Sequence, residues 1–107
     1  MTFEETYLND NILDALYDMH FEDMTPIQER CIPEILDGYD VLGIAQTGTG
    51  KTAAYLLPIH SQLDDGNYPK DAINCVIMSP TRELAQQIDQ AMQGFGYYLD
   101  DVSSVAV

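Results

Sequence analysis

The spacing of apolar residues in the first third of the chain predicts two helices. Residues 9–19 place apolar side chains at helical spacing, behind Asn and Asp residues that can cap a helix start. A second helix is predicted to start at Thr25-Pro26-Ile27-Gln28, with Thr25 as the cap and proline at the first helical position. Gln28 follows Thr25 by three residues and can complete a capping box. Pro33 is expected to end or kink this second helix.

Three short apolar runs predict strands: residues 40–45, 73–79 and 103–107. Such continuous runs are typical of a parallel sheet that is buried on both faces. Helical spacing separates the runs, over about 52–63 with an expected kink at Pro58, and again after Pro80-Thr81. Because strands alternate with helices, the pattern predicts an α/β fold with a parallel sheet flanked by helices.

Composition narrows the functional classes. The chain has 107 residues, with 18 acidic side chains against four basic ones and a net charge of −14. This charge repels polyanions, so any nucleic-acid binding must depend on a few placed groups. No apolar run approaches the ~18 residues of a membrane span, and no signal peptide is evident. Cys31 and Cys75 lie in apolar stretches and are predicted to be reduced core residues, as expected of a cytoplasmic protein. His20 and His60 lack ligand-spaced partners, so no zinc site is expected.

The clearest candidate for chemistry is the turn between the first predicted strand and the following helix: Ala45-Gln46-Thr47-Gly48-Thr49-Gly50-Lys51-Thr52. A strand, a Gly-rich turn ending in Gly-Lys-Thr and a helix form the setting of a phosphate-binding P-loop. Backbone N–H groups and the helix dipole would face the anion, Lys51 would reach the β- and γ-phosphates, and the Thr52 hydroxyl would bind Mg²⁺. The generic motif has glycine where Ala45 stands. The alternative is an ordinary Gly-rich loop with a solvated lysine.

Three blocks occur in a fixed order: Phe21 with Thr25-Pro26-Ile27-Gln28, then residues 45–52, then Pro80-Thr81-Arg82-Glu83-Leu84-Ala85. Together they resemble the Q motif, motif I and motif Ia of DEAD-box ATP-dependent RNA helicases. The resemblance covers essentially the whole chain. It also accounts for Ala45, since Ala-Gln-Thr-Gly-Thr-Gly-Lys-Thr is that family's own form of the P-loop.

The resemblance implies a role for each matching residue on the adenine side. Gln28 would read the adenine edge with its amide, and Phe21 would stack on the adenine ring. Phe3 stands where the family carries its isolated upstream aromatic, and Thr25 would tie the Q motif to the P-loop. The alternatives are that Gln28 only caps a helix and that Phe21 and Phe3 only pack in the core.

The resemblance also implies an RNA contact at Pro80, Thr81 and Arg82, where a helix N-terminus can add N–H donors to the sugar–phosphate backbone. The alternatives here are a simple helix cap at Thr81 and a solvated charge at Arg82. Two departures affect the adenine side: His20 stands where the family usually has glycine, and Met24 where proline is common.

The sequence lacks the Asp-Glu-Ala-Asp and Ser-Ala-Thr motifs of the family. We therefore expect a partial RecA-like domain truncated after about three strands, with a Q-motif region over 1–30 and the start of the ATP-binding domain over 31–107. Its parent would use ATP and Mg²⁺ to unwind or remodel RNA, with single-stranded or duplex RNA as partner and no membrane association. The fragment alone is expected to be inactive, and its oligomeric state is open. A generic P-loop ATPase or nucleotide kinase and a non-catalytic nucleotide-binding module are the alternatives.

Overall fold

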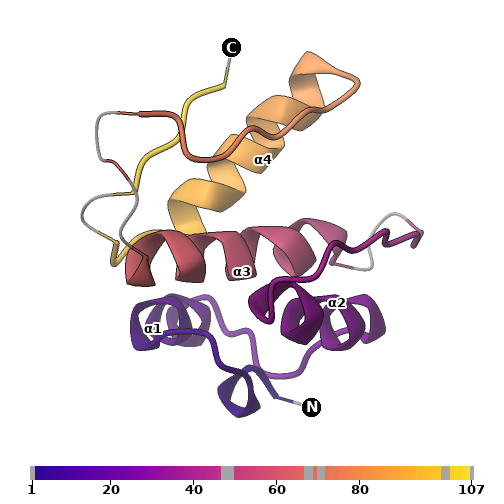
Figure 1. Cartoon of the computed structure of the whole chain (residues 1–107), viewed down its shortest axis with the longest axis vertical. Helices are drawn as coiled ribbons and strands as arrows, with labels where there is room; N and C mark the ends of the chain where they lie inside the picture. The colour runs from indigo at the N-terminus through magenta and orange to yellow at the C-terminus, as the bar shows by residue number, and fades with distance from the viewer. Residues whose placement is uncertain (1, 47–49, 67–68, 70–71, 100–101, 107) are drawn as a thin grey trace.

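In the part of the chain that the structure describes, four α-helices pack together and share a small core. The computed structural model describes residues 2–46, 50–66, 69, 72–99 and 102–106. Within these ranges a short 3-10 helix η1 (Phe3–Glu5) precedes α1 (Asp10–Asp18), α2 (Pro26–Leu36), α3 (Lys51–Asp65) and α4 (Arg82–Phe95). Figure 1 shows α3 crossing the middle of the molecule, with α1 and α2 along one side and α4 on the other. Since α3 packs against each of the other three helices, it is the centre of the fold.

The apolar faces predicted from helical spacing form this core. Its buried members come from every helix and from the segments before α1, before α2 and after α4. They are Phe3, Leu8, Ile12, Leu16, Met24, Ile32, Ala53, Leu56, Leu57, Ile88, Phe95 and Leu99. None of the described helices is long and apolar enough to cross a membrane.

Helix α1 begins and ends as its sequence dictates. At its start, the Asn9 side chain accepts a hydrogen bond from the Ile12 N–H at 3.0 Å, which confirms the predicted cap. At its end, His20 N–H donates to the Tyr17 carbonyl at 3.1 Å and Phe21 N–H donates to the Leu16 carbonyl at 2.9 Å. This pair of bonds is a Schellman motif, and it requires a left-handed residue at its centre. His20 occupies that position with φ of +62°.

Replacing His20 with glycine is expected to raise the free energy of unfolding by about 1 kcal/mol, because glycine adopts the left-handed conformation without the steric cost of a Cβ. The chain supplies its own matched control. Helix α2 ends in the same motif with Gly38 at φ of +90°, so Gly38→His should lower stability by a similar amount. Urea unfolding followed by circular dichroism measures both changes. A His20→Gly variant no more stable than the wild type would contradict the expectation.

The predicted parallel sheet is not formed by the residues that the structure describes. Segments 40–45 and 73–79, and the described part of 103–107, have no strand pairing, and an isolated antiparallel bridge joins Thr2 to Asp23. Five apolar side chains in the first two segments are 74–90% exposed: Leu42, Ile44, Ile73, Val76 and Met78. A strand is held by backbone hydrogen bonds to a neighbouring strand. The apolar runs indicate which residues suit burial in a sheet, and they do not supply the neighbour.

Two helices continue past an internal proline. Helix α2 continues through Pro33 to Leu36, so Pro33 does not end it. Helix α3 likewise includes Pro58 and runs to Asp65, close to its predicted end. Each proline removes one N–H donor from its helix. The two helices are held together by packing and by a hydrogen bond from Gln62 Nε2 to the Ile35 carbonyl at 3.1 Å.

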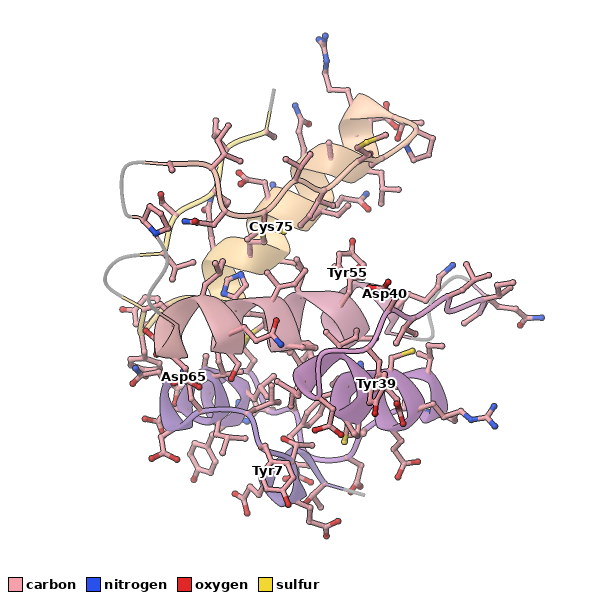
Figure 2. All side chains as sticks on the ribbon, in the orientation of Figure 1. Tyr7, Tyr39, Asp40, Tyr55, Asp65 and Cys75 are labelled. Carbon is pink, nitrogen blue, oxygen red and sulfur yellow. The ribbon has the colours of Figure 1, made fainter. Side chains whose placement is uncertain are left out.

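The two cysteines differ in burial. Both are free, but only Cys31 is buried as predicted; Cys75 is exposed on the segment between α3 and α4 (Figure 2).

Candidate nucleotide site

The N-terminus of α3 is the predicted phosphate-binding end. Gly50 is its N-cap residue with φ of +81°, and the Ala54 N–H donates to the Gly50 carbonyl at 3.2 Å. The N–H groups before Ala54 have no partner within the helix, as in any first turn. Lys51 is exposed and Thr52 is half-buried at this end. Ala45 and Gln46 lie just upstream, while Thr47, Gly48 and Thr49 lie outside the described residues. This helix end can therefore offer N–H donors, its dipole and the Lys51 cation to an anion.

The side chain of Gln28 joins the second predicted motif to this helix end. Its Oε1 accepts a hydrogen bond from the Thr25 N–H at 2.9 Å, forming the predicted capping box. Its Nε2 donates to the Gly50 carbonyl at 3.2 Å, and the residue is 3% exposed. A Cβ placed on Gly50 would lie 2.4 Å from Gln28 Nε2 and 3.2 Å from Thr25 Oγ1. The structure thus brings Thr25, Gln28 and Gly50 into one cluster. The Gln28 amide retains a second N–H and further acceptor capacity for a ligand.

The predicted adenine-side aromatics also lie together. The Phe3 and Phe21 ring centroids are 6.2 Å apart with the planes tilted by 37°. Phe3 is buried, whereas Phe21 is 38% exposed and can still offer ring surface to a ligand. Phe95 from α4 packs against Phe21 in an edge-to-face arrangement, with ring centroids 5.9 Å apart and ring planes at 72°. Helical spacing predicts only a core position for Phe95, and its contact with Phe21 comes from the structure alone.

The Thr52 hydroxyl oxygen is a suitable ligand for Mg²⁺ beside a phosphate chain. The Thr52 side chain is hydrogen-bonded to Tyr55, one turn along α3. Burial raises the pKa of Tyr55, and the bond to Thr52 lowers it by less, so the phenol is neutral at pH 7. A hydroxyl that makes one hydrogen bond keeps a lone pair for a metal. Since Mg²⁺ takes few protein ligands and completes its shell with phosphate oxygens and water, Thr52 fits this role.

The predicted RNA contact lies at the start of α4. Pro80, Thr81 and Arg82 are all exposed. The Thr81 hydroxyl accepts the Leu84 N–H at 3.1 Å, so it caps the helix as the simpler alternative supposed, with one lone pair left. In Figure 1, α4 starts away from α3 and runs toward it, so the N-terminus of α4 lies far from the N-terminus of α3. The nucleotide-side and RNA-side residues are therefore two separate groups.

Comparison with known proteins identifies the family. A model of the DEAD/DEAH box helicase family matches residues 25–106. This chain belongs to the DEAD/DEAH box helicase family. It is 45% identical over 106 residues to ATP-dependent RNA helicase DeaD of Klebsiella pneumoniae, an alignment that covers 99% of the chain and 16% of the relative. It is 48% identical over 96 residues to ATP-dependent RNA helicase CshA of Limosilactobacillus reuteri, covering 90% of the chain and 19% of the relative. The chain thus spans less than a fifth of the length of these helicases.

Solved structures of DEAD-box helicases share the backbone path. The RNA helicase Prp28 from Chaetomium thermophilum, solved with ADP, superposes with a TM-score of 0.87 at 39% identity and covers 97% of the chain and 26% of its own. A DEAD box protein from Methanococcus jannaschii superposes with a TM-score of 0.78 at 37% identity, over 89% of the chain and 25% of its own. These neighbours are RecA-like DEAD-box helicase domains. The similarity supports the expected RecA-like domain, whereas the described residues do not form the expected parallel sheet.

Proposed function

We propose that this chain supplies the adenine-nucleotide site of an ATP-dependent RNA helicase, whose ATP binding and hydrolysis drive RNA unwinding or remodelling. The observation that carries the proposal is the hydrogen bond from Gln28 Nε2 to the Gly50 carbonyl. It joins the residue expected to read adenine to the residue that begins the phosphate-binding helix. One ligand that holds a base and a phosphate chain can therefore engage both groups.

Each residue has a defined task in this proposal. Phe21 stacks on the adenine ring and Gln28 reads its edge, with Thr25 fixing the Gln28 side chain. The loop from Ala45 to Gly50 wraps the phosphates, and Lys51 neutralises the β- and γ-phosphate charge. Thr52 holds Mg²⁺, which supplies charge neutralisation at the phosphates when bound.

The remaining parts of the proposal concern RNA and the sheet. Thr81 and Arg82 contact the RNA backbone, with the N-terminus of α4 adding donors that offset the −14 charge. Residues 1–30 act as the Q-motif region and 31–107 as the first part of the ATP-binding domain. The exposed apolar segments 41–44 and 73–78 favour pairing as strands of a parallel sheet in the whole helicase domain.

Binding of a fluorescent ADP analogue with Mg²⁺, competed by ADP and by GDP, tests the proposal. We expect ADP to compete more strongly than GDP. Lys51→Ala should weaken ADP binding by about tenfold or more, because one charge-assisted contact is lost. Gln28→Ala should reduce the preference for ADP over GDP. Arg30→Ala removes the same charge from an exposed site on α2 and should bind as the wild type does.

The alternatives predict different results in the same assay. Equal competition by ADP and GDP would favour a generic P-loop ATPase or nucleotide kinase, since such proteins lack the glutamine contact. ATP turnover by the isolated chain would exclude the alternative of a non-catalytic nucleotide-binding module. A Lys51→Ala variant that binds ADP as tightly as the wild type would overturn the nucleotide site itself.

A further inference from the structure

The C-terminal end of α4 meets the end of α1 at three points, and these contacts surround the turn that carries Phe21. The Phe95 and Phe21 rings pack in an edge-to-face arrangement. A Cβ placed on Gly94 would lie 3.5 Å from Met19 Cε, so α4 passes close to the residue that ends α1. The Tyr98 hydroxyl, just beyond α4, donates to the Asp18 carboxylate. The ends of α1 and α4 are far apart in the sequence. They are held together by an aromatic contact, by close packing at Gly94 and by one hydrogen bond.

The turn itself needs such support. Phe21 lies outside any helix, directly after His20 in its strained left-handed conformation. One Phe21 ring contact is with Phe3, and the remaining described aromatic contact is with Phe95. The planes of Phe21 and Phe95 meet at 72°, an edge-to-face arrangement that fixes orientation as well as distance. Phe95 is 4% exposed and belongs to the packed core, so its own position is defined.

We infer that Phe95 is a positioning residue for adenine binding: its ring, packed in an edge-to-face arrangement with the Phe21 ring, acts with the Tyr98–Asp18 hydrogen bond to hold Phe21 in the orientation that stacks on the base. This inference rests on the proposed nucleotide site and adds α4 to it. The phosphate-binding end of α3 contains none of these contacts. Loss of the Phe95 ring therefore weakens recognition of the base and leaves recognition of the phosphates unchanged.

The test compares ADP with inorganic pyrophosphate, both in the presence of Mg²⁺, by calorimetric titration of the whole chain. Phe95→Leu keeps an apolar side chain and removes the ring, and ADP affinity should fall about fivefold while pyrophosphate affinity does not change. Adding Phe95→Leu to Phe21→Leu should cause no further loss, because Phe95 acts through Phe21. Ile88→Val is the matched control: it trims a buried residue of the same helix and should leave both affinities unchanged.

A second variant tests the inference independently if Phe95→Leu does not fold. Tyr98→Phe removes only an exposed hydroxyl and its bond to Asp18, and it should lower ADP affinity about twofold with pyrophosphate binding unchanged. Wild-type ADP affinity in both variants would overturn the inference, as would equal losses for ADP and pyrophosphate, which would indicate a structural role. A wild-type chain that binds ADP no better than Lys51→Ala would instead overturn the proposed nucleotide site, and the inference with it.

Discussion

Replacing Gly50 with alanine is expected to weaken ADP binding about a hundredfold. Gly50 has φ of +81°, a left-handed conformation that costs an alanine about 1–2 kcal/mol. The new Cβ would also stand 2.4 Å from Gln28 Nε2, far inside contact distance. Gln28 is buried and bonded at both ends of its amide, so it cannot swing aside without losing its bond to the Gly50 carbonyl, worth about 1 kcal/mol.

The free chain can relieve this strain only by moving one of two parts of the site. If Gln28 moves, the amide leaves the position from which it reads adenine. If the backbone at Gly50 moves, the start of α3 moves with it, including Lys51 and Thr52. ADP binding must then restore the strained arrangement. The strain at Gly50 and the lost hydrogen bond together cost about 2–3 kcal/mol of binding free energy, and about 2.7 kcal/mol corresponds to a hundredfold loss of affinity.

Competition against the fluorescent ADP analogue measures this loss, and Gly43→Ala is the matched control. A Cβ on Gly43 would meet Cys31 Sγ and Ile27 Cδ1 at 3.4 Å, and Gly43 has no positive φ. The same substitution a few residues upstream should therefore leave ADP affinity within about twofold. Wild-type affinity in Gly50→Ala would show that the contact between Gln28 and Gly50 does not shape the bound state.

Local sequence signals predicted most of what lies around the site. The caps at Asn9, Thr25 and Thr81 and the helix start after Gly50 depend on residues within four positions of one another, so their chemistry is readable without the fold. The departure at His20, where the family usually has glycine, gains its physical meaning from the structure, which gives this residue a φ of +62°.

Features that depend on distant partners were not predictable in the same way. An apolar run such as 73–79 fits a strand only where another strand lies beside it, and the described residues provide none. The contact of Phe95 with Phe21 joins residues 74 positions apart, and helical spacing indicates only that Phe95 faces a core. An end or a kink is predicted at Pro33 because the lost hydrogen bond is a local cost, whereas the packing that lets α2 continue to Leu36 is a tertiary gain.

Acidification from pH 6.5 to pH 4 is expected to destabilise the chain through His60, by up to about 3 kcal/mol. His60 is 1% exposed, and neither ring nitrogen has a hydrogen-bond partner in the part of the chain that the structure describes. Burial lowers its pKa from 6.5 to about 4. The unfolded chain therefore takes up a proton below pH 6.5, whereas the folded chain does so only near pH 4. Stability is then fully present above pH 6.5 and decreases as the pH falls through this window.

Because the chain is rich in carboxyl groups, the contribution of His60 to stability is measured as the difference between wild type and a variant without this histidine. Protonation of some of the 18 carboxyl groups at low pH relieves repulsion in the folded chain and opposes the His60 effect. His60→Leu keeps a similar volume in the core and has no titrating group, so both chains share the carboxylate contribution. The stability of His60→Leu relative to wild type should increase by about 2 kcal/mol between pH 7.5 and pH 5, measured by urea unfolding at each pH.

The other histidine supplies the control for this comparison. His20 is exposed, and His20→Asn keeps a residue type that tolerates the left-handed conformation. This variant should retain the pH dependence of the wild type. If the wild type and His60→Leu instead show parallel stability curves from pH 7.5 to pH 5, His60 takes up its proton as readily in the folded chain as in the unfolded one. That result would mean that the contact between α3 and Gly96, where a Cβ would meet the His60 ring at 2.9 Å, opens to water.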